Sequence, residues 1–181
     1  MIIYLIRHGK TEANERHLYC GSTDLPLSDA GIAELKEKRY SIQNARFLTS
    51  GMKRTEQTLE LLFGDVPHEA DLRFREVDFG DFEMRSYEEL KDDPAYQAWL
   101  TGDNEANVPP GGESGAQMTA RVIEAFQELW SGGEDTVLVT HGGVIAAIMA
   151  AQFPGEGKHR YQWQPANGGG YAVSKDGYQV L

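Results

Sequence analysis

Residues 2–12 read IIYLIRHGKTE, an apolar run that ends in an arginine, a histidine and a glycine. A short run rich in β-branched and apolar residues is typical of a buried strand. Residues 136–143, TVLVTHGG, have the same form, with His141 directly after the apolar run. In an open parallel sheet, ligands bind in the crevice outside the carboxyl ends of the strands. If the two strands are neighbours, the sequence predicts that His8 and His141 face one pocket, with Arg7 beside them.

Strand-like and helix-like stretches alternate along the rest of the chain. Expected strands lie at residues 2–7, 45–49, 66–72, 136–140, 161–163, 170–174 and 178–180. Expected helices lie at residues 11–16, from Ser28 to about Arg39, before Gly64, at 87–91 and 94–100, from Ser114 to Gly132, and at 144–152. Ser28 and Ser114 are typical helix N-cap residues. Because alternating strands and helices favour an α/β architecture, we predict an α/β fold with a mostly parallel central sheet.

The bulk composition is that of a folded protein with an acidic surface. The chain has 181 residues, 40% of them hydrophobic, and a formal net charge of −11. This length predicts one domain over residues 1–181, and the negative charge argues against a nucleic-acid partner. The N-terminal apolar run is too short for a signal sequence or a membrane span. A single cysteine, Cys20, excludes an intrachain disulfide, so we expect a cytoplasmic protein.

Arg7-His8-Gly9-Lys10-Thr11 resembles the Arg-His-Gly-x-Thr signature of the histidine phosphatase superfamily, and His141-Gly142 is similar to that family's second histidine pair. The resemblance implies a phosphoglycerate-mutase-like fold, a three-layer sandwich with helices on both sides of the sheet. It also implies that His8 is the nucleophile, which forms a phosphohistidine that water then hydrolyses. This chemistry uses a small phosphorylated substrate and no metal or other cofactor. It requires a neutral His8 whose other ring nitrogen is held by a hydrogen bond.

An acidic protein that binds an anion needs a local group of cations. Arg7 and Arg54 are the expected phosphate ligands, because a guanidinium group matches phosphate oxygens bidentately and stays charged. The pattern Ser50-x-x-x-Arg54-x-x-x-Thr58 resembles the family's arginine motif. Asn14, about one helical turn beyond the signature, is a further candidate ligand of the phosphate.

The second histidine pair is expected to complete the phosphate site. His141 would donate a hydrogen bond to a phosphoryl oxygen as charge develops in the transition state. Gly142 would let the phosphate approach the backbone closely.

Glu76 is the expected general acid. The leaving group of a phosphomonoester needs a proton, and the attacking water must later lose one, so one carboxyl group can serve both steps. Residues 75–80, REVDFG, match the context in which the family places this acid. Asp78, Asp81 and Glu83 are its rivals in the same stretch.

Residues 79–85, FGDFEMR, resemble the α-ribazole phosphatase branch of the family, as do Leu18-Tyr19-x-Gly21 and residues 110–114, PGGES. The resemblance implies α-ribazole 5′-phosphate as the substrate, and hence a role in cobalamin biosynthesis. The broad family usually has Trp-Glu-Gly where this chain has Phe82-Glu83-Met84. Residues 101–112, rich in Gly, Asn and Pro, are expected to form a loop at the rim of the pocket.

Other functions fit part of the same pattern. A broad-specificity histidine phosphatase for sugar phosphates or phosphoglycerates would carry the same motifs. A cofactor-dependent phosphoglycerate mutase would need a longer chain, with an added cap and a C-terminal tail. A metal-dependent hydrolase could use His8, His141 and Glu76 as ligands, but no His-Glu-x-x-His or clustered metal-ligand spacing occurs. A non-enzymatic phospho-binding module would normally lack the histidine or an arginine, and here Arg7 and Arg54 are both present.

Overall fold

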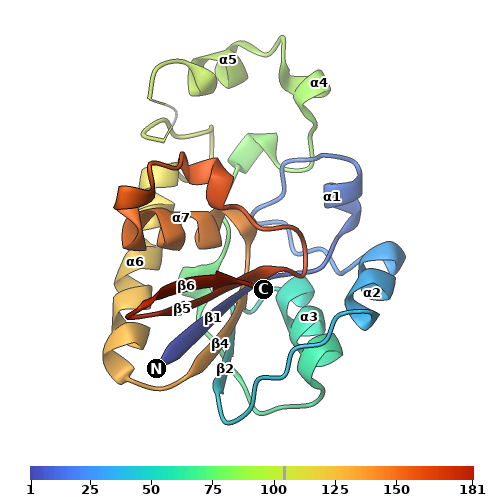
Figure 1. Cartoon of the computed structure of the whole chain (residues 1–181). Coiled ribbons are helices and arrows are strands. Elements are labelled where there is room, and N and C mark those ends of the chain that lie inside the picture. The colour runs from blue at the N-terminus through green and yellow to red at the C-terminus, as the bar shows by residue number, and fades with distance from the viewer. Residues whose placement is uncertain (104) are drawn as a thin grey trace.

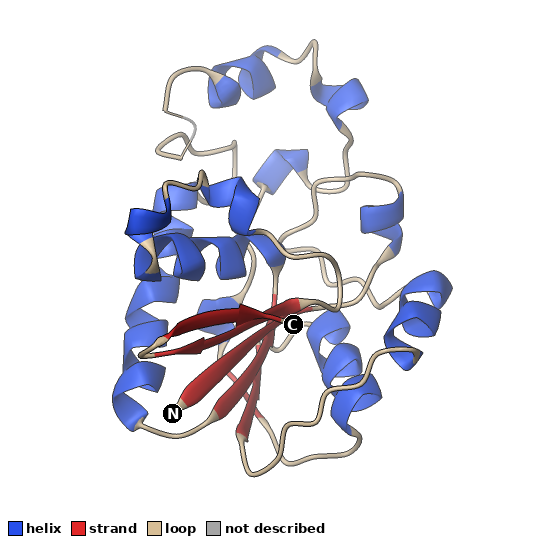
Figure 2. Ribbon diagram, in the orientation of Figure 1, coloured by secondary structure: helices blue, strands red, loops and turns tan. Residues whose placement is uncertain are grey.

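Strand β1 lies near the middle of a six-stranded mixed sheet in the computed structural model, which describes residues 1–103 and 105–181 (Figures 1 and 2). In spatial order the strands are β3 (Glu69–Ala70), β2 (Arg46–Thr49), β4 (Thr136–Thr140), β1 (Ile2–Arg7), β5 (Gly170–Ser174) and β6 (Gly177–Val180). The first four strands are mutually parallel, and β5 and β6 are antiparallel to their neighbours. The predicted α/β fold with a mostly parallel sheet is therefore confirmed.

Helices cover both faces of this sheet. They are α1 (Glu12–Glu15), α2 (Asp29–Lys36), α3 (Lys53–Phe63), α4 (Tyr87–Leu90), α5 (Pro94–Leu100), α6 (Gly115–Gly132) and α7 (Gly142–Gln152). Figure 1 shows α6 and α7 on one side of the sheet and α2 and α3 on the other. The alternation of side chains along β1 explains this arrangement, because Ile3 and Leu5 pack into the core beneath α6 and α7, whereas Ile6 joins the core on the α3 face.

Helix α7 is apolar on all sides, and most of its side chains are buried, as a helix packed into the core requires. No helix in the described part of the chain is long and apolar enough to cross a lipid bilayer.

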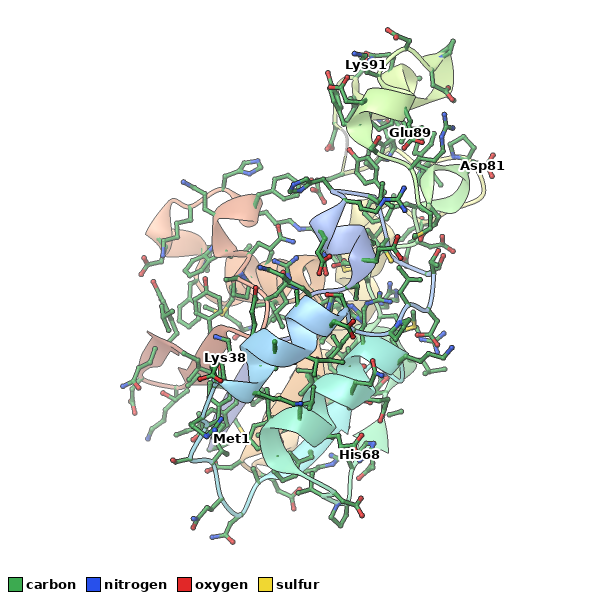
Figure 3. The ribbon with its side chains drawn as sticks, turned by 90° about the vertical axis from the view of Figure 1, so that its right-hand side faces the viewer. Met1, Lys38, His68, Asp81, Glu89 and Lys91 are labelled. Carbon is green, nitrogen blue, oxygen red and sulfur yellow. The ribbon has the colours of Figure 1, made fainter. Side chains whose placement is uncertain are left out.

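Residues 79–100, the cap segment, lie beyond the carboxyl ends of the parallel strands (Figure 1). They include the 3₁₀ helix η2 (Gly80–Phe82), α4 and α5. A separate aromatic cluster holds the cap segment together: Phe82, Leu90 and Tyr96 are buried, with Tyr19, Phe79 and Trp99 packed against them. Figure 3 shows Glu89 and Lys91 on the outer part of this segment, away from the sheet.

Most element predictions are confirmed, and the failures have local causes. Ser28 and Ser114 are N-caps, as predicted, although the helix after Ser28 ends at Lys36. The expected strand at 66–72 shrinks to Glu69–Ala70, because Pro67 lacks a backbone donor and residues 72–74 form a 3₁₀ helix, η1 (Leu72–Phe74).

The expected strand at 161–163 is wrong. These residues lie in the 3₁₀ helix η4 (Arg160–Trp163), whose first turn is closed by the side chains of His159 and Gln162. Only Trp163 in this stretch is buried, and it packs into the core with α7. Residues 101–103 and 105–112 form neither helix nor strand, in keeping with the predicted rim loop, and residue 104 of that loop lies outside the described residues.

Met84 occupies a backbone conformation that favours glycine, with φ of 60°. Its N–H donates to the carbonyl oxygen of Tyr19 at 2.7 Å, which joins the cap segment to the loop after α1. A left-handed conformation costs an L-residue about 1–2 kcal/mol, and glycine loses about 0.5–1 kcal/mol of that gain to chain entropy. We therefore expect Met84→Gly to raise the free energy of unfolding by about 0.5–1 kcal/mol in urea titrations. Met84→Ala, which keeps the strain, should give no such increase, and a destabilised glycine variant would contradict the explanation.

Candidate active site

The ends of β1 and β4 bring two histidines together. Arg7 pairs with Thr140 in the register of the two strands, and the His8 N–H donates to the Thr140 carbonyl oxygen at 2.9 Å. The residue after each strand end is then a histidine, and the ring centroids of His8 and His141 lie 5.2 Å apart. Both side chains are buried. The sequence-predicted pair of imidazoles thus shares one pocket at the carboxyl edge of the sheet.

His8 is held as a neutral ring with one free lone pair. Its Nδ1 lies 2.6 Å from the Gly9 carbonyl oxygen, and because a carbonyl can only accept, Nδ1 carries the proton. Burial, reinforced by the charge of Arg54, lowers the pKa of His8 to about 3. At neutral pH the ring is therefore uncharged, and the Nε2 lone pair is available to an electrophile.

A chain of hydrogen bonds orients His141. The Nε–H of Arg54 donates to Nδ1 of His141 at 3.3 Å, so the proton of the neutral ring lies on Nε2. Nε2 donates to the Ser50 hydroxyl at 2.8 Å, Ser50 donates to the Thr55 hydroxyl, and Thr55 donates to the Met52 carbonyl oxygen at 2.7 Å. Burial and the charge of Arg54 hold the pKa of His141 well below its usual value.

Arg54 lies inside the molecule, 1% exposed, and not on the helix surface. Its Nη1 and Nη2 groups donate to the carbonyl oxygens of Thr23 and Gly21 at 2.9 and 2.8 Å, which leaves further N–H groups for a ligand. Burial lowers the pKa of the guanidinium group, and the nearby acids Glu76 and Glu83 oppose that effect. A buried guanidinium so held is a preorganised anion ligand.

Arg7 is the last residue of β1, directly before His8, and it lines a separate hollow together with Asn14. Its Nη1 donates to the Pro165 carbonyl oxygen at 2.7 Å. Its Nε is buried and has no hydrogen-bond partner among the described residues. Since a buried donor without a partner is costly, Nε is suited to an anionic ligand. Burial lowers the pKa of Arg7, and Glu76 opposes that effect.

The Glu76 side chain contacts the N-terminus of α7, the helix that directly follows His141. Its carboxylate accepts from the Gly143 N–H at 2.8 Å and from the Val77 N–H at 3.1 Å. A Cβ on Gly143 would lie 2.3 Å from a Glu76 carboxylate oxygen, so the glycine makes room for this carboxylate. The charge of the carboxylate also favours a raised pKa for both arginines, against the effect of their burial.

The rival acids lie elsewhere. Glu83 accepts hydrogen bonds from the backbone N–H groups of Gly21, Ser22, Thr23 and Phe79 and from the Thr23 hydroxyl. It thereby fixes the loop whose carbonyl groups hold Arg54. Asp78 accepts from Ser22 and Gly80. Asp81 is exposed, and Figure 3 shows it at one side of the cap segment.

Asn14 and Gly142 have structural partners at the pocket. The Asn14 side-chain oxygen closes the capping box of α1 by accepting from the Thr11 N–H at 3.0 Å, so its amide NH₂ is the group left to meet a phosphate. A Cβ on Gly142 would lie 2.3 Å from Nε2 of Gln164. The close approach at Gly142 in this structure is therefore to a side chain of the protein itself.

A cavity of about 290 Å³ opens next to this group of residues. Glu76 and Gly143 line it, together with the aromatic side chains of Tyr19, Phe79, Trp99 and Tyr161. Charged side chains line it as well, among them Glu105, Glu113 and Arg160. The Glu76 carboxylate thus adjoins a space whose walls are partly aromatic and partly charged.

Comparison with known proteins identifies the family. The model of the histidine phosphatase superfamily (branch 1) matches residues 3–179. The chain belongs to the histidine phosphatase superfamily. The adenosylcobalamin/alpha-ribazole phosphatase of Salmonella typhimurium is 35% identical to it over 159 residues, which cover 83% of this chain and 78% of that protein. Membership of this superfamily supports the conclusion that the chain is a phosphatase enzyme.

Solved structures of superfamily members have the same fold. A putative alpha-ribazole-5′-P phosphatase from Escherichia coli matches all of this chain and 94% of its own, with a TM-score of 0.86 and 26% identity. A phosphoglycerate mutase from Thermus thermophilus matches all of this chain and 96% of its own, with a TM-score of 0.77 and 31% identity. The phosphoglycerate-mutase-like fold expected from the superfamily signature is confirmed.

The sequence did not predict the structural roles of Ser50, Thr58 and Glu83. The 50/54/58 spacing has a structural explanation. Ser50 accepts from Nε2 of His141, Arg54 donates to Nδ1 of the same ring, and Thr58 accepts from the Gly9 N–H at 2.9 Å. The structural role of Glu83 is not predictable, because nothing in the sequence indicates which backbone groups a carboxylate meets. Its five donors come from two segments far apart in the chain.

Ser50→Ala tests the hydrogen-bond chain behind the second histidine of the superfamily. The substitution leaves the buried Nε2–H of His141 without its acceptor, which costs about 1–3 kcal/mol of stability. We expect kcat for phosphate release to fall about tenfold, because the imidazole loses its fixed tautomer. Ser50→Thr, which keeps a hydroxyl, should retain more activity than alanine, and an alanine variant with wild-type kcat would contradict the role of Ser50.

Proposed function

We propose that the protein is a phosphomonoesterase that hydrolyses a small phosphate ester through a phosphohistidine on His8. The observation that carries the proposal is the state of His8, whose Nδ1 proton is bound to the Gly9 carbonyl while Nε2 keeps its lone pair. A neutral imidazole with one committed nitrogen is a suitable nucleophile. Two arginines and one carboxylate stand around it, as phosphoryl transfer requires.

In the first step, Arg7 and Arg54 bind the phosphoryl oxygens and Nε2 of His8 attacks phosphorus. The bond from phosphorus to the ester oxygen breaks as the bond to nitrogen forms. Glu76 enters this step as the carboxylic acid and donates its proton to the departing oxygen, which leaves as an alcohol. The charge of the bound phosphate favours a protonated His141. Protonated Nδ1 no longer accepts from the Arg54 Nε–H, so both N–H groups then donate to phosphoryl oxygens.

In the second step, water attacks the phosphohistidine. Glu76, now a carboxylate, accepts a proton from the water, and the bond between phosphorus and Nε2 breaks. Inorganic phosphate leaves, and His8 and Glu76 return to their starting states. The amide group of Asn14 and the backbone N–H of Gly142 are further candidate ligands of the phosphoryl oxygens.

We propose α-ribazole 5′-phosphate as the substrate. The Salmonella relative supports this proposal, since it is named an adenosylcobalamin/alpha-ribazole phosphatase. The aromatic walls beside Glu76 also support it, because flat heteroaromatic bases stack well on aromatic side chains. A triose phosphate would leave much of such a cavity empty.

The test is phosphate release from α-ribazole 5′-phosphate beside sugar phosphates, phosphoglycerates and nucleotides, with a chelator present. We expect kcat/KM for α-ribazole 5′-phosphate to exceed the others by at least about 100-fold. Similar kcat/KM values for all substrates of the panel would instead favour a broad-specificity phosphatase and leave the His8 mechanism intact. Loss of all activity with the chelator, reversed by a divalent cation, would contradict hydrolysis without metal.

The name of the Thermus structure keeps a mutase as the second candidate. The same panel distinguishes the two functions. A mutase would interconvert 3- and 2-phosphoglycerate in the presence of the bisphosphate faster than it releases phosphate. We expect phosphate release to dominate.

A further inference from the structure

Arg121, on the second turn of α6, binds the backbone that carries Glu76. Its Nη1 donates to the carbonyl oxygens of Arg73 and Arg75 at 2.7 and 2.8 Å. Its Nη2 donates to the carbonyl oxygen of Glu76 itself at 3.2 Å. One guanidinium group therefore engages three carbonyl groups within four consecutive residues.

Glu113 fixes this guanidinium group from the other side. Its carboxylate accepts from Nε and Nη2 of Arg121 at 2.8 and 2.7 Å, a bidentate pair. The Glu113 N–H also donates to the Asp78 carbonyl oxygen at 2.8 Å. The backbone is thus held on both sides of Glu76, before it through Arg121 and after it through Glu113.

We infer that Arg121 is a positioning residue for Glu76. Its hydrogen bonds fix the backbone from which the Glu76 carboxyl group reaches the Gly143 N–H and lines the cavity. A general acid must lie within hydrogen-bond reach of the leaving oxygen, and a misplacement of 1 Å can cost about 10²-fold in rate. This inference rests on the proposed role of Glu76 as the acid.

A purely structural role for Arg121 makes a different prediction. If Arg121 only stabilises the fold, its loss lowers the activity on every substrate alike. If it positions the acid, the loss depends on the leaving group. A nitrophenolate leaves without a proton, whereas an alkoxide needs one.

The experiment measures kcat/KM for p-nitrophenyl phosphate and for an alkyl phosphate such as α-ribazole 5′-phosphate. This parameter reports on the first chemical step, in which the leaving group departs. For Arg121→Met we expect a fall of about 10–100-fold on the alkyl ester and less than about threefold on the nitrophenyl ester. Arg121→Lys should recover part of the loss, because an ammonium group can still bind a carbonyl.

Two further variants calibrate the result. Glu76→Gln should show the same dependence on the leaving group, more strongly. Glu128→Gln is the matched control, because Glu128 also lies on α6 and binds Arg73 through its side chain, at 2.7 Å, without touching Glu76. It should behave as wild type on both substrates.

The outcomes separate the inference from the proposed function. Equal losses on both esters in Glu76→Gln would remove the acid role of Glu76, and the inference with it. If Glu76→Gln lost more activity on the alkyl ester than on the nitrophenyl ester but Arg121→Met lost equally on both, the inference alone would be overturned. If Arg121→Met does not fold, Arg121→Lys and Glu113→Gln take its place. Glu113→Gln weakens the ion pair that holds Arg121, and both variants are judged by kcat/KM on the same two esters.

Discussion

His8→Ala is expected to lower kcat for every phosphomonoester by about 10⁴-fold or more, the loss typical of a removed nucleophile. The physical reason lies in the ring's hydrogen bonds. The Gly9 carbonyl holds Nδ1 and the low pKa keeps Nε2 unprotonated, so this one ring supplies the attacking lone pair. The measurement is steady-state phosphate release, with circular dichroism to show that the variant folds.

His68→Ala is the control for this substitution. His68 is a surface residue in contact with Glu56, and Figure 3 shows it far from the cap segment. It should retain nearly full kcat. A His8→Ala variant with more than about 1% of the wild-type kcat would contradict nucleophilic catalysis by this histidine.

Arg54→Lys is expected to have the second-largest effect, a loss of about 10²–10³-fold in kcat/KM. The guanidinium group simultaneously meets Gly21, Thr23 and His141, and it must still offer N–H groups to the phosphate. A lysine supplies the charge but only one nitrogen, so it cannot hold the loop, the imidazole and the ligand at once. The affinity for inorganic phosphate, measured by competitive inhibition, should fall together with kcat/KM.

Lys53→Met provides the comparison for Arg54. Lys53 precedes Arg54 on α3 but is exposed, so the loss of its charge should change kcat/KM less than about twofold. If Arg54→Lys kept its phosphate affinity, the pocket would bind the phosphoryl group mainly through Arg7.

The paired strand ends made the centre of the site predictable from sequence. An apolar run followed by histidine and glycine occurs twice, and parallel strands deliver their carboxyl ends to one edge. Glu76 was predicted in a different way, through the resemblance of residues 75–80 to the context in which the family places its acid. The structure adds the strand order, β4 beside β1, which follows from packing of the whole chain.

The hydrogen-bond networks behind the site could not be predicted. Ser50 and His141 are 91 positions apart in the chain, and Arg121 is 45 positions from Glu76. No periodicity or propensity connects residues at such separations. The strand predicted at 161–163 failed for a related reason: burial of Trp163 against α7 favoured a 3₁₀ turn over an extended chain.

Direct detection of the phosphoenzyme is the measurement that tests the central claim most directly. The protein is mixed with its best substrate and quenched within milliseconds in alkali, in which a phosphorus–nitrogen bond survives, and its peptides are then examined by mass spectrometry. We predict one phosphoryl group, on the peptide that contains His8, and its absence in His8→Ala. Turnover without a phosphorylated peptide, or label on His141 in place of His8, would contradict the account.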